Sequence, residues 1–152
     1  MEKKPVIRIS KEFKFEMAHA LMGYDGPCRN IHGHSYGLTV TVAGAPISDE
    51  SHTKLGMVMD FGDLKKIVRE TVINEFDHAL LLNSKMPDVL LEEMKSSFEK
   101  IIEVDYQPTS EMMIIDFAER IRSRLPADIE LKHLLLRETE TSYAEWFAEE
   151  NK

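Results

Sequence analysis

Two segments of the chain alternate apolar and polar side chains regularly enough to require a β-sheet with one buried face. Residues 7–17, IRISKEFKFEM, place apolar side chains at every second position, and Lys11 is the exception. Residues 36–44, YGLTVTVAG, do the same, and the apolar side chains of one parity are Tyr36, Leu38, Val40 and Val42. Successive side chains of a strand point to opposite faces, so each segment predicts a half-buried strand.

Farther along the chain the apolar period changes to that of a helix. An apolar stripe from Phe61 predicts one helix, and a second begins after Pro108 with Thr109 or Ser110 as its N-cap. The remaining segments predict a short helix at 88–100, a strand at 129–139 and an edge strand or tail at 143–147, whereas 77–87 is irregular and 100–106 ambiguous. Strands flanking a few helices, without strand–helix–strand alternation, favour an α+β fold with an antiparallel sheet in a single domain, residues 1–152.

Charge and cysteine content narrow the range of partners and compartments. The formal net charge is −8, which suits a nucleic-acid backbone poorly, so we expect no nucleic-acid partner. A single cysteine cannot form an internal disulfide, which fits a reducing compartment. The first residues, MEKKPVIRIS, lack the apolar core of a signal peptide, and no apolar run approaches the roughly 20 residues of a membrane span. We therefore expect a cytoplasmic protein without a membrane partner.

The segment CRNIHGHSY, residues 28–36, carries the strongest indication of chemistry. Imidazole is the commonest zinc ligand, and the pair His32 and His34, one residue apart on an extended segment, has both rings on one side. His19 shares the parity of the buried side chains before it, so its inward imidazole would complete a three-histidine site. Three histidines leave a fourth position open, as in catalytic zinc sites, whereas Cys28 as a fourth ligand would close the site. The residues alone are compatible with both arrangements.

An ordered set of short motifs gives the chain a resemblance that covers nearly its whole length. The motifs FEMAH, CRNIHGHSY, GMVMDF, DHALLLN, PTSE and RET occur in this order. Together they resemble the 6-pyruvoyl-tetrahydropterin synthase family, and within it most closely the 6-carboxytetrahydropterin synthase branch. The resemblance implies that His19, His32 and His34 hold zinc. It also implies that the cysteine before the HGH motif, Cys28, is catalytic rather than a ligand.

The resemblance assigns roles to residues whose sequence context alone indicates only structure. Asp77 and His78 resemble the catalytic partners of the cysteine, and a carboxylate can fix the tautomer of a histidine that moves protons near neutral pH. Glu138, near the end of the last long strand, resembles the carboxylate that anchors the pterin. Thr109 and Glu111 match positions that contact the pterin, although both also fit the start of a helix.

For the fold, the resemblance implies the T-fold: an antiparallel four-stranded sheet with helices packed on one face, which assembles with neighbouring subunits into a barrel. A homohexamer with active sites at subunit interfaces is expected. The implied reaction converts 7,8-dihydroneopterin triphosphate to 6-carboxy-5,6,7,8-tetrahydropterin, acetaldehyde and triphosphate, a step toward queuosine and other deazapurines. The alternatives are the pyruvoyl enzyme, which eliminates triphosphate but keeps the three-carbon side chain, and a non-catalytic zinc protein with Cys28 as fourth ligand.

Overall fold

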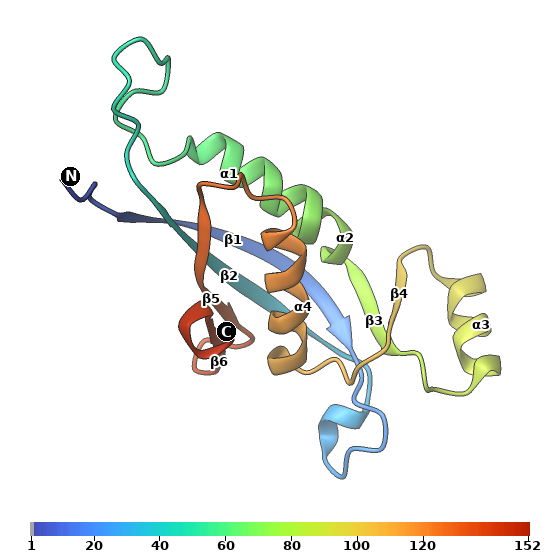
Figure 1. Ribbon diagram of the computed structural model, residues 1–152. Helices are drawn as coiled ribbons and strands as arrows, with labels where there is room; N and C mark the ends of the chain where they lie inside the picture. The colour runs from blue at the N-terminus through green and yellow to red at the C-terminus, as the bar shows by residue number, and fades with distance from the viewer. Residues whose placement is uncertain (1) are drawn as a thin grey trace.

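A long antiparallel hairpin forms the centre of the fold. The computed structural model describes residues 2–152, and its two longest strands are β1, Ile7–His19, and β2, His32–Gly44. They pair along their whole length, from Ile7 opposite Gly44 to His19 opposite His32 (Figure 1). The predicted alternation is confirmed, because one face of the hairpin is buried through Phe13, Phe15, Met17, Tyr36, Leu38, Val40 and Val42.

Four shorter strands extend the hairpin into a six-stranded sheet of order β4-β3-β1-β2-β5-β6. On one side, β5, Glu130–Arg137, and β6, Tyr143–Phe147, continue the antiparallel pattern. On the other side, β3, Ala79–Asn83, pairs parallel with β1, and β4, Ile101–Val104, pairs parallel with β3. The sheet is therefore mixed. The prediction of a four-stranded antiparallel sheet describes β1, β2, β5 and β6 and is wrong for the opposite edge.

The interpretation of residues 77–87 as irregular is wrong because β3 is covered on both faces. Leu81 belongs to the main core, while Leu80 and Leu82 pack with α3, Asp88–Ser97, on the other face. A strand buried on both faces has no polar positions to alternate with the apolar ones, so its sequence lacks the period of two. α3, which lies beside β3 and β4 in Figure 1, therefore packs on the face opposite the remaining helices, and this corrects the prediction that helices pack on one face only.

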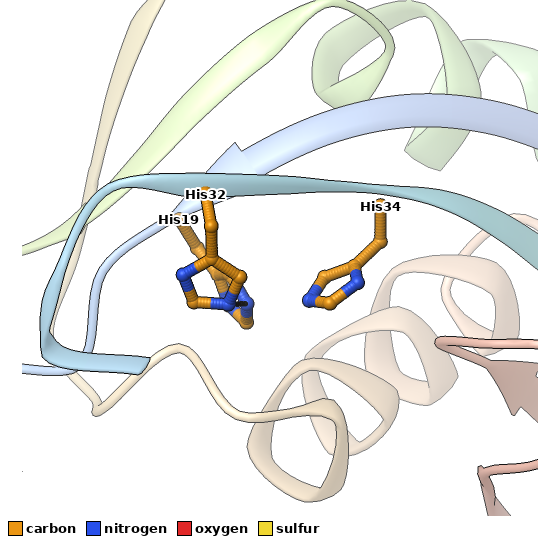
Figure 2. Close-up of side chains that lie close together, drawn as sticks. All are labelled: His19, His32 and His34. Atoms are coloured by element: carbon orange, nitrogen blue, oxygen red, sulfur yellow. Dashed lines mark hydrogen bonds between the residues drawn. The ribbon is translucent and has the colours of Figure 1, made fainter. Parts of the chain in front are cut away.

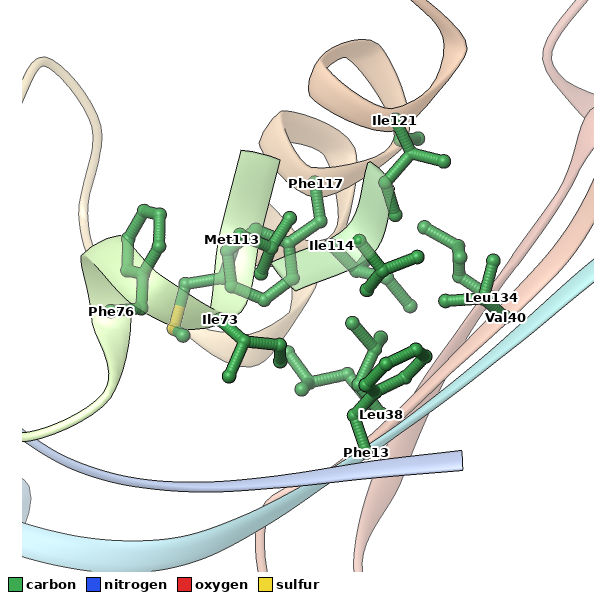
Figure 3. Packing of buried hydrophobic residues seen from close by; sticks show 14 of the residues in the cluster. Phe13, Leu38, Val40, Ile73, Phe76, Met113, Ile114, Phe117, Ile121 and Leu134 are labelled. Carbon is green, nitrogen blue, oxygen red and sulfur yellow. The ribbon is translucent and has the colours of Figure 1, made fainter. Parts of the chain in front are cut away.

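Two helical segments cover the main face of the sheet. The first runs from α1, Phe61–Val68, through a π-helical turn, Arg69–Ile73, into α2, Asn74–Phe76. The second is α4, Ser110–Arg122. Their apolar sides meet the sheet in one core (Figure 3), which includes Ile73, Phe76, Met113, Phe117, Ile121 and Leu134. No helix among residues 2–152 combines the length and the apolar character needed to cross a bilayer.

Both of these helical segments begin at a capping side chain, and the sequence predicts the cap of the second segment at Thr109 or Ser110. The carboxylate of Asp60 accepts a hydrogen bond from the N–H of Gly62, and Oγ1 of Thr109 accepts one from the N–H of Met112. Such caps satisfy main-chain donors that have no partner inside the helix. The cap at Thr109 fixes the point where α4 begins, and this point lies next to the end of β1.

Candidate metal centre and active site

Three histidines converge at one end of the central hairpin. His19 is the last residue of β1 and lies directly opposite His32, the first residue of β2, with His34 farther along β2. Opposite residues of an antiparallel pair share a face, so the three rings project from the same side of the hairpin (Figure 2). Each ring offers one ligand nitrogen, and these nitrogens all lie within 4.8 Å of one another. The structure thus brings together the three histidines predicted as ligands.

Backbone carbonyls fix the tautomers of two of these rings. Nδ1 of His19 lies 2.7 Å from the carbonyl oxygen of Pro108, and Nδ1 of His32 lies 2.7 Å from that of Asn30. A carbonyl can only accept a hydrogen bond, so each Nδ1 carries the ring proton and each neutral ring has a lone pair at Nε2. The two Nε2 atoms lie 3.0 Å apart. Lone pairs at this distance repel each other unless a cation or an added proton compensates them. Histidines that bind a metal through one ring nitrogen commonly donate a hydrogen bond from the other, as Nδ1 of His19 and of His32 does here.

Burial disfavours protonation of two of these rings, those of His19 and His34. Desolvation is the main effect that lowers the pKa of His19, against a smaller opposing effect of the Pro108 hydrogen bond. Desolvation also lowers the pKa of His34. Both rings are therefore neutral at pH 7, which is the state in which imidazole binds a metal ion.

A carboxylate faces the histidines from the end of β5. Oε1 of Glu138 lies 3.4 Å from Nε2 of His34 and 3.6 Å from Nε2 of His19. Nε2 of His34 is buried and has no hydrogen-bond partner. The site thus gathers imidazole lone pairs and a negative charge in one small region, which fits a bound divalent cation. Nitrogens on one tetrahedral zinc ion lie ~3.3 Å apart, so only small movements of the rings would be needed.

Cys28 is close to these histidines in sequence but does not join their cluster. It belongs to a 3₁₀ turn, Pro27–Arg29, within the loop of residues 20–31 that joins β1 to β2, and it is partly exposed. Among residues 2–152, the one group of three or more side chains placed to share a metal consists of the three histidines. This geometry favours an open site with a separate thiol over a closed site with Cys28 as fourth ligand.

Asp77 and His78 lie on the other face of the sheet. Oδ1 of Asp77 accepts a hydrogen bond from the N–H of Glu16 at 2.9 Å, and the N–H of His78 donates to the Glu16 carbonyl at 2.6 Å. The His78 ring is 76 % exposed and borders a surface depression. This depression also reaches His34, but the His78 ring lines a second pocket with Leu80 and Met94, which pack on the α3 face of the sheet. The structure therefore does not bring Asp77 and His78 to the histidine cluster of their own chain.

The Asp77–His78 turn is held in one conformation. The Glu16 N–H is the main cause of a lowered pKa for Asp77, with His78 and Lys100 also contributing. Nζ of Lys100 donates to the carbonyl of Asn74 at 2.8 Å and to that of Asp77. Nδ1 of His78 lies 3.0 Å from Oδ1 of Asp77, and His78 has φ of 63°, a conformation uncommon outside glycine and concentrated at functional sites. An ionised carboxylate beside an exposed imidazole is suited to proton transfer.

Thr109 and Glu111 occupy the start of α4. Thr109 is the N-cap, 3.3 Å from the N–H of Met112, and Glu111 is exposed in the first turn. The Pro108 carbonyl that orients His19 immediately precedes this cap, so the start of α4 borders the histidine cluster. Sequence reasoning missed the contribution of Pro108, because a backbone carbonyl leaves no signal in the residue type.

Known proteins resemble this chain along almost its whole length. The family model described as 6-pyruvoyl tetrahydropterin synthase matches residues 8–149. A 6-carboxy-5,6,7,8-tetrahydropterin synthase of Haemophilus influenzae is 37% identical over 148 residues, which are 93% of this chain and 99% of the relative. A dihydroneopterin monophosphate aldolase of Pyrococcus furiosus is 34% identical over 129 residues, which are 85% of this chain and 87% of the relative. The structure of a 6-pyruvoyl tetrahydropterin synthase of Caenorhabditis elegans has the same fold, with a TM-score of 0.70 at 24% identity over 97% of this chain and 99% of that chain.

Proposed function

The chain belongs to the 6-pyruvoyl tetrahydropterin synthase family, and from this premise we propose that it is a 6-carboxy-5,6,7,8-tetrahydropterin synthase. The reaction converts 7,8-dihydroneopterin triphosphate and water to 6-carboxytetrahydropterin, acetaldehyde and triphosphate. The Haemophilus influenzae relative supports this branch of the family. The observation that carries the proposal is the cluster of His19, His32 and His34, in which carbonyl partners direct two lone pairs toward one point.

Zinc is the proposed metal. Three neutral imidazoles with a fourth position left for substrate are a ligand set of catalytic zinc. Zinc held by His19, His32 and His34 would supply Lewis acidity that lowers the pKa of hydroxyl groups on the substrate side chain. The carbonyls of Pro108 and Asn30 would keep two of the rings oriented, as such partners do in zinc sites.

Two side chains are proposed to move the protons, and a third is proposed to hold one of them in place. Cys28, as a thiolate, would remove a proton from the substrate side chain, and a nearby cation favours the thiolate. His78, held by Asp77, would transfer a second proton near neutral pH. Thr109 and Glu111, at the start of α4, would contact the pterin beside the histidine cluster.

Glu138 is proposed to anchor the pterin ring. A carboxylate can accept two parallel hydrogen bonds, here from the 2-amino group and the neighbouring ring N–H. Glu138→Gln keeps the shape of the side chain but loses the charge and one acceptor. We expect this variant to bind the substrate about 1.5–3 kcal/mol more weakly, the scale of a hydrogen bond to a charged group. Equilibrium titration with dihydroneopterin triphosphate measures the loss.

Glu145→Gln is the matched control for this change. Glu145 pairs with His133 on the β5–β6 hairpin, at 2.7 Å, and should leave substrate affinity unchanged. Zinc content separates two roles of Glu138, whose carboxylate lies within 3.6 Å of two histidine nitrogens. Unchanged affinity in Glu138→Gln would remove this residue from the pterin site. Loss of zinc together with affinity would make it a metal ligand instead.

A complete active site is proposed to need a second copy of the chain. The histidine cluster lies on one face of the hairpin (Figure 2), whereas the exposed ring of His78 lines a pocket with Leu80 and Met94, which pack on the other face. The two groups could act on one substrate only if a neighbouring subunit presents its own Asp77–His78 turn to the cluster. We therefore propose a homo-oligomer, expected to be a hexamer with subunits joined into a barrel, in which active sites lie at subunit interfaces.

Mixing two impaired variants tests this assembly. Cys28→Ala and His78→Ala each lack one proton-transfer group, but a mixed oligomer has interfaces where one subunit supplies Cys28 and the other supplies His78. Random association of equal amounts would restore about a quarter of wild-type turnover, because each intact group is present at half of the positions. Turnover is measured after joint refolding, and native mass spectrometry verifies mixing. Mixed oligomers without recovery would place both groups in the same subunit.

Product analysis tests the reaction itself. Incubation with 7,8-dihydroneopterin triphosphate should release equal amounts of acetaldehyde and triphosphate. Triphosphate without acetaldehyde would identify the pyruvoyl reaction, which keeps the three-carbon side chain. Preferred turnover of dihydroneopterin monophosphate would instead match the activity named for the Pyrococcus furiosus relative. Bound zinc without turnover of any of these substrates would favour a non-catalytic zinc protein.

A further inference from the structure

A single glutamine ties the loop that carries Cys28 to the rest of the molecule. Oε1 of Gln107 accepts a hydrogen bond from the N–H of Met22 at 3.1 Å, and Nε2 of Gln107 donates to the Met22 carbonyl at 2.8 Å. Other hydrogen bonds of residues 21–29 stay inside the loop, such as that from the N–H of Leu21 to the Cys28 carbonyl at 3.0 Å. Within residues 2–152, Gln107 thus makes both hydrogen bonds that join this segment to another part of the chain.

The residue that follows Gln107 in the chain orients a metal-site histidine. Pro108 follows Gln107, and its carbonyl accepts the hydrogen bond from Nδ1 of His19. Gln107 is in turn oriented by Asn83 at the end of β3, which is 5% exposed and donates from its amide to Oε1 of Gln107 at 3.3 Å. Gln107 therefore positions the Cys28 loop, and the next residue, Pro108, orients the ring of His19.

We propose that Gln107 is a positioning residue that holds the Cys28 loop so that the thiol reaches a substrate at the histidine cluster. The inference rests on the proposed function, because that function gives Cys28 its role in proton transfer. The glutamine amide offers an acceptor oxygen and a donor NH₂ group side by side, and these match the N–H and the carbonyl of Met22 as a neighbouring strand would. A loop joined to the fold by so few bonds opens readily once they are removed.

The rate of thiol alkylation reports on this loop, because Cys28 is the only cysteine of the chain. Gln107→Leu removes both hydrogen bonds to Met22, while Gln107→Glu keeps the acceptor and loses the donor. We expect iodoacetamide to react on the order of tenfold faster with Gln107→Leu than with the wild-type protein, and Gln107→Glu to be intermediate. Zinc content should not change, because the carbonyl that orients His19 belongs to the backbone of Pro108.

Turnover should fall most in Gln107→Leu and less in Gln107→Glu. The fall should appear in kcat rather than in KM, because Glu138 and the other groups proposed to bind the pterin are unchanged. A side chain that merely stabilised the fold would not produce this division between the two constants. Asn151→Leu is the matched control. The Asn151 amide also donates to a backbone carbonyl, that of Phe147 at 2.8 Å, but near the end of the chain. Its loss should leave alkylation and kcat at the wild-type level.

A folded, zinc-containing Gln107→Leu protein with the wild-type alkylation rate and kcat would overturn the proposal. If this variant does not fold, Gln107→Glu and Asn83→Ala provide the same test with smaller changes, and unchanged alkylation in both would overturn it. Alkylation and zinc content are measured without substrate. They therefore test the role of Gln107 even if the wild-type protein fails to turn over dihydroneopterin triphosphate, a result that would refute the proposed function instead.

Discussion

Replacing His32 with alanine is expected to abolish metal binding and turnover together. The change removes one of three nitrogens that lie within 4.8 Å of one another. Loss of a group that only orients a metal ligand typically lowers metal affinity 10–100-fold, so loss of a ligand should cost more than about a hundredfold. Zinc content after dialysis against a weak chelator measures the first effect, and acetaldehyde release measures the second. His32 is preferable to His19 for this test, because His19 is buried, with 2% of its surface exposed, and its replacement would leave a cavity.

His133→Ala is the matched control for the metal site. His133 lies on β5, pairs with Glu145 at 2.7 Å and is not part of the histidine cluster. This variant should keep about one zinc ion per chain and wild-type turnover. A His32→Ala protein that retained zinc and activity would disprove the site. Loss of zinc from both variants would indicate a damaged fold rather than a missing ligand, which circular dichroism would verify.

The elements that could be predicted from the sequence are those with one buried face. β1 and β2 keep a period of two because Phe13 and Tyr36, with others of their parity, are buried while their neighbours are not. β3 could not be predicted, because α3 covers one of its faces and the main core the other. Its parallel pairing, with Met17 opposite Ala79, brings together segments far apart in the chain, and no local pattern specifies it.

The candidate site also contains some features that could be predicted from the sequence and others that could not. His19 continues the buried parity of β1, so the sequence predicts its place beside His32. The carbonyl of Pro108 and the position of the Asp77–His78 turn could not be predicted, because every residue type has a carbonyl and the turn is placed by the pairing of β3 with β1. Gln107 gave no signal either, since its amide acts on the backbone of a loop distant in sequence.

The role of Cys28 can be decided by measuring two quantities on one protein preparation. A proton-transfer residue and a fourth zinc ligand both require the thiolate, so loss of activity alone does not distinguish them. Bound zinc does, because removing a thiolate ligand lowers metal affinity, whereas removing a thiol that neither binds the metal nor orients a ligand does not. The structure favours the first role, since Cys28 lies in a partly exposed turn and is not a member of the histidine cluster.

Cys28→Ala is expected to keep about one zinc ion per chain while turnover falls on the order of a hundredfold or more, the usual contribution of a general acid–base group. Cys28→Ser should be impaired to a similar degree, because a serine hydroxyl keeps the size of the side chain but does not ionise near neutral pH. Zinc and acetaldehyde release are measured on the same samples. Zinc loss in step with activity would establish Cys28 as a ligand and contradict the open site. Full activity with zinc retained would exclude both roles and leave the proton transfer to His78 and Asp77.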